Sequence, residues 1–568
     1  MRQSDVLVFT TCYNERENIG LLIDQIAAVV PSADILVVDD SSPDGTWEVI
    51  EQRRTIHPQL RAVSRPGKLG IGSAHKYALF YAIREGYKTV VTMDADFSHD
   101  PALIPSLLAA HGPNVFVTGS RYCAGGSSDY SGYRDIVSRL GNKLARFVLG
   151  VHIAELTTYF RVFDVQSLRR LPLRLVAASG YSYGVELVYH LRKAGIELRE
   201  VPIHFGDRTR GASKIPRLQI LKSALDLFLL GLRRFEILRD LKPDEIVGDA
   251  CASCGDRVLA MKHFGSRPSE MADANAHSAE YRCTAVGARH YPPVYTCLAC
   301  GLEQVPASLV PAGLESLYQD VVDTAYVENI PVREKTYKRC FDQIAPFMPQ
   351  RSRTVLEVGA YCGLFLKEAA RRGYQGVGVE PSSWASRYAR EQSGVTVHHG
   401  YLDALGDRLE RRYDLVVSWD VLEHVRDPLA FLKQCGEYLD EGGTLAISTL
   451  DVDTWAPRFL GKRWPWLMHM HLFYFSTRTL KTLLRNAGFE LIASDRYVHY
   501  ASARYMYSGG LRILPRLLRT PLSYLSVLVP RRLMIPVAFG DVKLFVAKKC
   551  SSAARPSCLN LPATAVMS

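Results

Sequence analysis

The sequence predicts an α/β protein with two separate sheet domains and a small cysteine-containing module between them. Apolar, β-branched runs alternate with segments of helical periodicity, and this alternation stops near residue 240 and starts again at Thr354. Two CxxC pairs lie in the interval. The chain has 568 residues, of which 47% are hydrophobic and 22% charged, so it can bury more than one core.

The first α/β region runs from Val6 to about Glu200. Its predicted strands are VLVFT, ILVVDD, TVVTMDAD and VFVTGS, with helical segments between them. Such an alternation predicts a parallel sheet covered by helices. The second region repeats the pattern with TVLEVGA, YQGVGVEP, YDLVVSWD and TLAISTL. We expect domains at 1–238, 239–334 and 335–550, and a disordered tail at 551–568.

The net charge of +11 suits an anionic partner such as a phosphate, a nucleotide or an acidic membrane surface. No apolar run approaches the roughly 20 residues that span a bilayer, and the start lacks the features of a signal peptide. Segments 215–238 and 511–532 interleave leucine with arginine and lysine, which is typical of helices on a membrane surface or at the edge of a core. We expect a cytoplasmic protein, peripherally associated with the inner face of the membrane.

Two strands of the first region end in acidic residues. Asp94 and Asp96 close TVVTMDAD, and alternating strand geometry sends both side chains to one side. Two hard oxygen ligands suit Mg²⁺ or Mn²⁺ bridging a diphosphate, although many acidic pairs at strand ends only bind water. Asp39 and Asp40 end an earlier strand, at the edge where open α/β sheets bind ligands.

A basic loop follows the first region. The sequence FGDRTRGASK places Arg208, Arg210 and Lys214 around Gly211. Such a loop suits gripping a diphosphate or a phosphate acceptor, and the alternative is an ordinary solvated loop.

Six motifs between Thr11 and Lys214 occur in the order and spacing of polyprenyl-phosphate mannosyltransferases: TCYNERENI, VVDDSSPDGT, MDADFSHDP, GSRY, TYFRVF and DRTRGASK. The region resembles the dolichol-phosphate mannose synthases of glycosyltransferase family 2. The resemblance implies a GT-A (Rossmann-like) fold and inverting transfer of a hexose, typically mannose from GDP-mannose, to a polyprenyl phosphate. It also implies a nucleoside site formed by Thr11, Tyr13, Glu15, Val38 and Asp40.

The same resemblance implies that metal and diphosphate contact Asp94, Ala95 and Asp96, and that the phosphates are faced by Arg121, Arg208 and Lys214. A phosphate acceptor is already an anionic nucleophile, so neutralising the leaving diphosphate can suffice, and we assign no base. We expect the catalytic residues to be Asp94, Asp96, Arg208 and Lys214.

The sequence departs from this family in two places. Thr11 stands where proline is usual, and ELTTYFR, ending at Arg161, replaces Asp-x-Thr-Gly-x-Phe-Arg. These departures leave the acceptor open, so another nucleotide sugar, or a glycan or protein acceptor, is an alternative. No QxxRW-like motif is present, which argues against a processive polysaccharide synthase.

Two CxxC pairs, each followed by glycine, are formed by Cys251, Cys254, Cys297 and Cys300. Four such thiolates can close a structural zinc site, with Cys283 or His290 as substitutes for one ligand. The alternative is a pair of turns with buried cysteines. Neither pair opens a helix after a strand, which argues against a redox role. A nucleic-acid partner is not expected, because the sequence shows no pattern of interleaved aromatic and basic residues that would form a binding surface for one.

The second region opens with a strand, a glycine turn and a helix in VLEVGAYCGLFL. We expect Glu357, Gly359 and Gly363 to be cofactor-binding residues, and the two glycines let the backbone approach a cofactor. Glu380, after the next strand, is placed to accept hydrogen bonds from ribose hydroxyls.

Three further segments follow this pattern: GYLDAL, which contains Asp403, YDLVVSWDVLEHVRDP and DEGGTLAIST. With them, the region resembles the class I S-adenosylmethionine methyltransferases. The resemblance implies a Rossmann-like domain that binds S-adenosylmethionine, with Asp403 contacting the adenine. From the cysteine module to GDVKLFVAKK, the sequence is similar to zinc-knuckle methyltransferases of sugar and cell-envelope biosynthesis.

Tyr361 replaces the middle glycine of the family's GxGxG, where the carboxypropyl end of the cofactor passes. Two interpretations remain open: an active methyltransferase acting on a sugar, lipid or envelope intermediate, or a silent cofactor-binding module that docks or regulates the first domain. His424, His469 and His471 are candidates for a general base or for substrate orientation, because neutral imidazole can take a proton near pH 7. Of these, His424 in WDVLEH is preferred.

Overall fold

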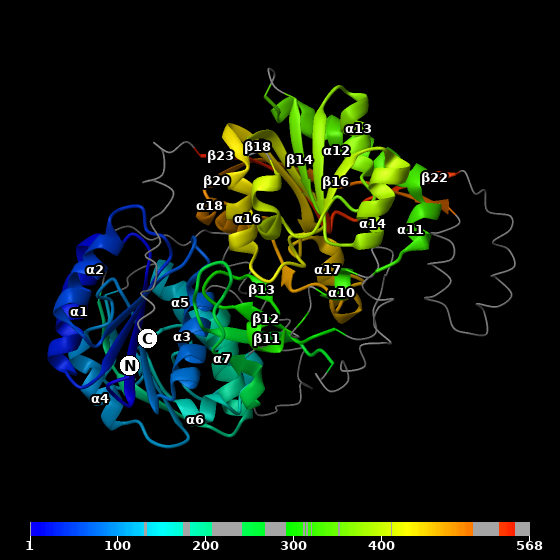
Figure 1. Cartoon of the computed structure of the whole chain (residues 1–568). Coiled ribbons are helices and arrows are strands. Elements are labelled where there is room, and N and C mark those ends of the chain that lie inside the picture. Colours follow the sequence, from blue (N-terminus) through cyan, green and yellow to red (C-terminus); the bar gives the residue numbers. More distant parts are fainter. Residues whose placement is uncertain are drawn as a thin grey trace, which may run out of the picture. The chain divides into compact units, whose positions relative to one another are not determined.

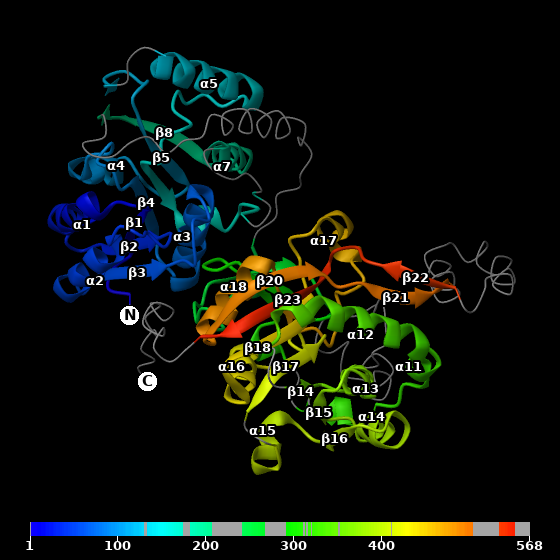
Figure 2. The ribbon, with the colours of Figure 1, turned by 90° about the horizontal axis from the view of Figure 1, so that it is seen from above.

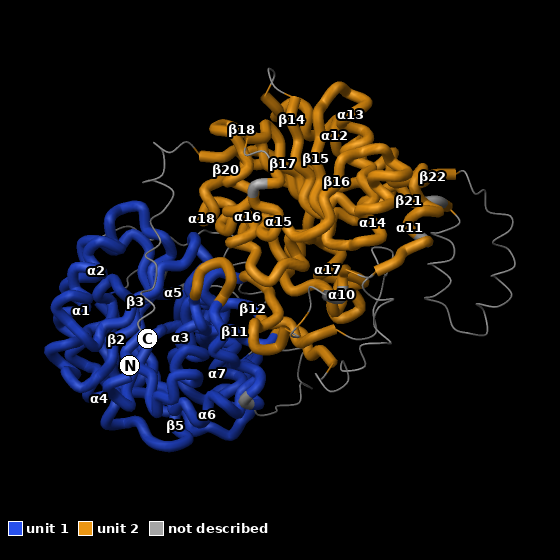
Figure 3. The backbone as a smooth tube through the Cα atoms, viewed as in Figure 1, with its two compact units in different colours: residues 1–250, 256–261, 296–301 blue, residues 251–255, 262–295, 302–568 orange. Residues whose placement is uncertain are grey.

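The computed structural model divides the chain into two compact units (Figure 3). Unit 1 contains residues 1–250, 256–261 and 296–301, and unit 2 contains residues 251–255, 262–295 and 302–568. The structure describes residues 2–129, 133–173, 176, 182–206, 241–266, 291–310, 313, 316–319, 321–349, 353–409, 412–503 and 533–550.

Unit 1 is built on a sheet covered by helices (Figure 1). The sheet has seven strands in the order β3-β2-β1-β4-β7-β5-β8. Its strands are β1 (Val6–Cys12), β2 (Asp34–Asp39), β3 (Leu60–Ser64), β4 (Thr89–Asp94), β5 (Val115–Ser120), β7 (Arg161–Asp164) and β8 (Glu197–Pro202). Its helices are α1 (Arg16–Val29), α2 (Thr46–Ile56), α3 (Ile71–Glu85), α4 (Ile104–Ala109), α5 (Tyr133–Leu149), α6 (Val165–Leu168) and α7 (Ser182–Lys193). All six residues of β2 are buried, which explains its continuous apolar run.

One strand corrects the prediction of a parallel sheet. β7 lies between β4 and β5 and runs antiparallel to both, while the pairs β1–β2, β1–β4, β2–β3 and β5–β8 are parallel. A strand of four residues is too short to show a periodic pattern, so the sequence did not reveal it. Its buried Arg161 donates hydrogen bonds to the carbonyls of Leu156 at 2.7 Å and Gly184 at 3.0 Å.

Unit 2 contains a second seven-stranded sheet of order β16-β15-β14-β17-β18-β23-β20 (Figure 2). Its strands are β14 (Thr354–Val358), β15 (Gln375–Glu380), β16 (Thr396–His399), β17 (Tyr413–Trp419), β18 (Leu439–Leu450), β20 (Phe489–Arg496) and β23 (Val542–Lys549). The first five are parallel, and β23 runs antiparallel between β18 and β20. The predicted strands beginning at Thr354 are confirmed.

Helices of unit 2 include α10 (Ser316–Gln319), α11 (Thr324–Glu328), α12 (Ile330–Ile344), α13 (Leu364–Arg371), α14 (Ser383–Tyr388), α15 (Leu402–Leu405), α16 (Pro428–Glu437), α17 (Trp455–Leu460) and α18 (Thr477–Asn486). α16 begins where the carboxylate of Asp427 accepts hydrogen bonds from the backbone N–H groups of Leu429 and Ala430, a side-chain N-cap. No helix within the described ranges is long and apolar enough to cross a bilayer.

A small sheet of order β10-β11-β12-β13-β19 contains the cysteine segment. Its strands are β10 (Ile246–Val247), β11 (Leu259–His263), β12 (Val294–Cys297), β13 (Glu303–Gln304) and β19 (Phe473–Tyr474). The glycine after each CxxC pair has a left-handed backbone and closes a turn. Gly255 donates to the carbonyl of Cys251, and Gly301 to that of Cys297, both at 2.8 Å. The two pairs therefore form matching knuckles.

Candidate functional sites

The carboxyl ends of β1, β2 and β4 bring together residues expected to hold a nucleotide and a metal. Thr11 on β1 pairs in register with Val38 on one side and with Asp94 on the other. The hydroxyl of Thr11 donates a hydrogen bond to the carbonyl of Val38 at 3.2 Å. Ala95 and Asp96 follow Asp94 directly, so much of the predicted set lies at one edge of the sheet.

The loops at this edge of the sheet contain non-glycine residues with a strained, left-handed backbone. Asn14, Ser41 and Phe97 follow β1, β2 and β4, and their φ angles are 58°, 53° and 61°. A non-glycine residue in this left-handed region costs on the order of 1–3 kcal/mol, and such residues cluster at functional sites. The sequence gave little sign of this strain, since only asparagine among the three favours this conformation.

The two acidic residues after β4 are held within their own loop. The backbone N–H of Asp94 donates to Nδ1 of His99 at 3.0 Å, so the proton of the neutral ring is on Nε2, which donates to the Thr158 hydroxyl at 2.9 Å. Burial lowers the pKa of His99 to about 4, which keeps it neutral. The backbone N–H and the hydroxyl of Ser98 donate to Oδ1 of Asp96 at 3.1 and 2.6 Å. Two carboxylates in this setting fit Mg²⁺ or Mn²⁺ that takes its other ligands from a diphosphate and water.

Asp40, after β2, is held by a partner that sequence reasoning missed. The guanidinium of the fully buried Arg65 donates to Oδ1 of Asp40 at 2.6 Å, and the backbone N–H groups of Leu69 and Gly70 donate to Oδ2 at 3.1 and 3.3 Å. Burial raises the pKa of Asp40 despite these donors. The carboxylate therefore anchors the loop before α3 to the strand end.

The other two predicted nucleoside residues lie in the loop after β1. The ammonium of Lys68 lies 4.4 Å from the centre of the Tyr13 ring, a cation–π contact. The carboxylate of Glu15 accepts a hydrogen bond from the side-chain amide of Asn18 at 2.8 Å. The aromatic ring of Tyr13 offers a surface against which a base can stack.

Arg121, expected to face phosphates, forms a buried ion pair. Its Nε donates to Glu155 at 2.7 Å, and its guanidinium reaches the hydroxyl of Thr157 at 3.2 Å. Both partners belong to the stretch that departs from the family pattern. Arg208, Arg210 and Lys214 lie outside the described residues. The whole of segments 215–238 and 511–532 lies outside them as well.

α5 carries an exposed apolar stripe that the sequence analysis did not single out. Ile136, Leu140 and Leu144 are more than half exposed, and Phe147 is 87% exposed. Exposed basic side chains flank the stripe: Arg139, Lys143 and Arg146. The spacing of three and four residues could have revealed this face, because it is the spacing of one side of a helix.

The four cysteines of the two knuckles form a compact cluster. The sulfur atoms of Cys251, Cys254, Cys297 and Cys300 all lie within 4.8 Å of one another. Tetrahedral zinc with Zn–S bonds of about 2.3 Å sets the sulfurs about 3.8 Å apart, which is within this limit, so the cluster is compatible with a zinc ion. The suggested substitutes Cys283 and His290 lie outside the described residues.

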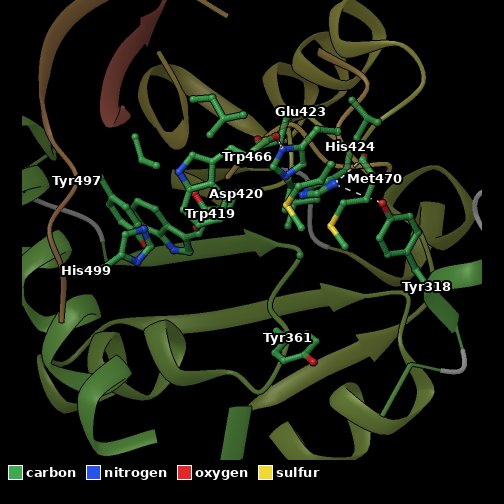
Figure 4. Close-up of a pocket in the computed structure, with 18 of the residues that line it drawn as sticks. Tyr318, Tyr361, Trp419, Asp420, Glu423, His424, Trp466, Met470, Tyr497 and His499 are labelled. Atoms are coloured by element: carbon green, nitrogen blue, oxygen red, sulfur yellow. Dashed lines mark hydrogen bonds between the residues drawn. The ribbon is translucent and has the colours of Figure 1, made fainter. Parts of the chain in front are cut away.

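Unit 2 contains a cavity of about 1530 Å³ at the carboxyl ends of its parallel strands. Its walls include the predicted residues Gly359, Tyr361, Glu380, Asp403, His424 and His471. Figure 4 labels two of them, Tyr361 and His424. Three predicted residues do not line it: Glu357, Gly363 and His469. Glu357 is buried on β14, where burial raises its pKa well above the usual range, and Gly363 begins α13 with a φ of 72°.

Glu380 is presented to the cavity at the end of β15. Its two oxygens accept hydrogen bonds from the backbone N–H groups of Tyr361 and Ser382, each at 2.8 Å. Burial raises the pKa of Glu380 to about 7. At Gly359 the φ is 81°, and an added Cβ would lie 2.5 Å from a methyl group of Val421, so only glycine fits. This arrangement of a buried carboxylate beside a close-packed glycine turn fits the ribose of S-adenosylmethionine.

Tyr361 has a backbone conformation that favours glycine. Its φ is 46°, in the left-handed region. Its ring packs edge-on against Tyr326, with centroids 4.5 Å apart, and also contacts Trp384 at 6.1 Å. The substitution therefore leaves the turn intact and adds an aromatic wall to the cavity.

Two histidines of the cavity are held by backbone carbonyls. Nδ1 of His424 bonds to the carbonyl of Met470 at 3.0 Å, and Nδ1 of His471 to that of Trp466 at 2.8 Å. Burial lowers the pKa of both rings, so both are neutral at pH 7. Glu423, in the loop after β17, is a buried carboxyl that accepts a hydrogen bond from Thr449 at 2.9 Å. Sequence reasoning missed Glu423 although it adjoins His424 in WDVLEH.

Comparison with known proteins gives the class of each unit. Residues 7–171 match the model of "Glycosyl transferase family 2", and residues 332–494 match that of "Methyltransferase domain". An undecaprenyl-phosphate mannosyltransferase of Micrococcus luteus is 33% identical over 236 residues, covering 41% of this chain and 97% of that one. A polyprenol monophosphomannose synthase of Mycolicibacterium smegmatis is 34% identical over 230 residues, covering 40% and 87%.

Among solved structures, a SAM-dependent methyltransferase from Archaeoglobus fulgidus aligns with a TM-score of 0.27 and 15% identity, covering 40% of this chain and 100% of that one. The two family matches show an enzyme with two transferase domains. The chain belongs to glycosyltransferase family 2, where it resembles polyprenyl-phosphate mannosyltransferases, and a methyltransferase domain follows on the same chain, with the four-cysteine cluster between them in sequence.

Proposed function

We propose that the first unit transfers a hexose, mannose from GDP-mannose, to a polyprenyl phosphate in a metal-dependent, inverting reaction. The observation that carries this proposal is the meeting of Thr11, Val38 and Asp94 on adjacent strands at the carboxyl edge of the sheet. The two mannosyltransferases named above support the choice of sugar and acceptor.

In this proposal Asp94 and Asp96 hold Mg²⁺ or Mn²⁺ against the diphosphate, and Arg208 and Lys214 hold the phosphates of donor and acceptor. A bound divalent ion neutralises charge that develops on the leaving diphosphate. Thr11, Tyr13, Glu15, Val38 and Asp40 form the nucleoside pocket. No general base is assigned, because the phosphate acceptor attacks as an anion.

The second unit methylates a sugar, lipid or cell-envelope intermediate. Glu380 accepts hydrogen bonds from the ribose hydroxyls of S-adenosylmethionine, Asp403 contacts the adenine, and the turn at Gly359 and Gly363 admits the cofactor. The buried position of Glu380 at the end of β15 supports this assignment. The four cysteines hold a structural zinc ion, and we place domain boundaries at 1–238, 239–334 and 335–550.

Peripheral attachment to the inner face of a membrane fits the α5 stripe. Its exposed apolar side chains and flanking basic groups are the two features by which an amphipathic helix binds an anionic bilayer surface. This attachment brings a polyprenyl acceptor to the first unit. Flotation with anionic liposomes tests it: the wild-type chain floats, and a Phe147→Ser variant floats less.

The deciding experiment is transfer of radiolabelled mannose from GDP-mannose to a short polyprenyl phosphate, with Mg²⁺ or Mn²⁺ and with a chelator. We expect lipid labelling that requires the metal. The Asp94→Asn variant should lose labelling, while Asp100→Asn, an exposed carboxylate of the same loop, should retain it. Absence of labelling by the folded wild-type chain would refute the choice of donor or acceptor, and other nucleotide sugars would then be screened.

A second candidate for the methyltransferase unit is a silent, cofactor-binding module that docks or regulates the first unit. Tyr361 is the observation that favours it, because its ring narrows the path of the cofactor's carboxypropyl end. The product of the mannose assay, offered as methyl acceptor with labelled S-adenosylmethionine, distinguishes the two. Cofactor binding without any methyl transfer to a panel of envelope sugars and lipids supports the silent module.

A further inference from the structure

The methyltransferase cavity contains a second group of metal-ligating side chains, distinct from the cysteine cluster. Glu423, His424 and His471 each offer one ligand atom, and these three atoms lie within 4.8 Å of one another. All three residues line the cavity that Glu380 and Asp403 also line. Figure 4 shows Glu423 and His424 close together on one wall. We propose that these three side chains bind a divalent transition-metal cation that holds the oxygen atom of the methyl acceptor.

The backbone fixes the three residues relative to one another. Glu423 and His424 lie in the loop after β17, and His471 lies two residues before the start of β19. The carbonyl of Glu423 accepts hydrogen bonds from the backbone N–H groups of Leu472 and Phe473, at 2.8 and 3.2 Å. These bonds join the two loops at the cluster itself. A site assembled in this way costs little reorganisation when a cation binds.

The hydrogen bonds of the two rings set their tautomers for metal binding. A backbone carbonyl can only accept, so Nδ1 of His424 and of His471 carries the proton in each bond to Met470 and Trp466. Nε2 then carries the lone pair in both neutral rings. A histidine that binds a metal commonly donates its other N–H to a backbone carbonyl in this way.

The carboxylate completes the set of ligands. One oxygen of Glu423 accepts a hydrogen bond from the hydroxyl of Thr449 at 2.9 Å, which orients the group. Asp420, a nearby carboxylate, is not included among the ligands, because its Oδ1 accepts a hydrogen bond from the hydroxyl of Ser448 at 2.6 Å. Two imidazoles and one carboxylate are ligands that suit zinc, iron or nickel more than magnesium. Three protein ligands leave a coordination position open, as in catalytic zinc sites.

An open position in this cavity suits a hydroxyl of the acceptor. A cation lowers the pKa of a coordinated hydroxyl, whose proton passes to solvent water. The oxygen then attacks the methyl carbon of S-adenosylmethionine, a C–O bond forms, the C–S bond breaks, and S-adenosylhomocysteine leaves with the electron pair. The class of acceptor is therefore an alcohol, and the product is a methyl ether. This role rests on the proposed function, whereas the cation site stands on the geometry alone.

Zinc content of the full chain tests the site. After saturation with Zn²⁺ and gel filtration, we expect His471→Gln and Glu423→Gln each to retain one zinc ion fewer per chain than the wild type. His469→Gln is the matched control, since it changes a buried histidine two positions away that does not line the cavity, and it should retain the wild-type content. Thermal melting shows that each variant is folded.

If both folded variants keep the zinc content of the wild type, the proposed site is wrong. Cys297→Ser should remove a different zinc ion, so its loss should add to that of Glu423→Gln in the double variant; a non-additive result also contradicts the site. Failure of methyl transfer with the cavity zinc still bound would refute the proposed function and leave the metal site standing. Methyl transfer to an alcohol that is unchanged in Glu423→Gln would refute the role given to the cation.

Discussion

Glu380 gives cofactor binding a dependence on pH that can be measured directly. Burial raises the pKa of this carboxyl to about 7 in the cofactor-free protein. In the proposed cofactor site, only the ionised carboxylate can accept hydrogen bonds from both ribose hydroxyls while it also accepts from the backbone N–H groups of Tyr361 and Ser382. Binding of S-adenosylmethionine therefore selects the ionised form and weakens as the pH falls through about 7.

The size of the effect follows from the ionised fraction. With a pKa of about 7, this fraction is about 0.9 at pH 8 and about 0.1 at pH 6, so the dissociation constant should rise about tenfold between them. Isothermal titration calorimetry at several pH values measures it. The Glu380→Gln variant is the control, because it keeps any titration of the cofactor itself and removes that of the protein. Parallel pH profiles for wild type and variant would refute the reasoning.

Three other changes have distinct expected results. Asp96→Ala should lower mannose transfer at least about 100-fold, through loss of a metal ligand, and leave the dissociation constant of S-adenosylmethionine unchanged in calorimetry. Glu155→Gln removes the charge that pairs with the buried Arg121 and should lower the free energy of unfolding by about 3–5 kcal/mol, measured by urea denaturation. Cys297→Ser should release the zinc ion of the cysteine cluster and lower the melting temperature, as metal analysis and calorimetry would show.

Each of these has a matched comparison. Loss of both mannose transfer and cofactor binding in folded Asp96→Ala would contradict separate sites. Glu51→Gln, which breaks an exposed ion pair with Arg54, should cost less than about 1 kcal/mol, and an equal cost at both positions would refute the argument from burial. Cys435→Ser changes a buried cysteine outside the cluster and should leave the zinc content unchanged.

The sequence predicted the parts of the fold that repeat a pattern. Long apolar strands such as β2 and β17 stand out because every residue is buried, and the residues at their ends meet at one edge of each sheet. β7 was not predicted, because four residues are too few to show the alternating periodicity of a strand. Its reversed direction depends on the path of the chain between β5 and β7, which periodicity does not encode.

Contacts between residues that are distant in sequence could not be predicted either. Arg65 holds Asp40, and Glu155 holds Arg121, but neither pairing follows from spacing, since each joins different loops of the fold. Glu423 shows the same limit. Its neighbour His424 was expected to matter, but the approach of His471 depends on hydrogen bonds between two loops more than forty residues apart.

The ring of Tyr361 also has a consequence for selective inhibition. The ring packs on Tyr326 and Trp384. In the proposed cofactor site it would occupy space that glycine at this position leaves open to a bulky group of an inhibitor. A cofactor analogue trimmed at its amino-acid end should lose little affinity for this enzyme and much for glycine-bearing ones. The side chain of Tyr361 is thus a natural difference in pocket shape by which an inhibitor could distinguish this enzyme from its relatives.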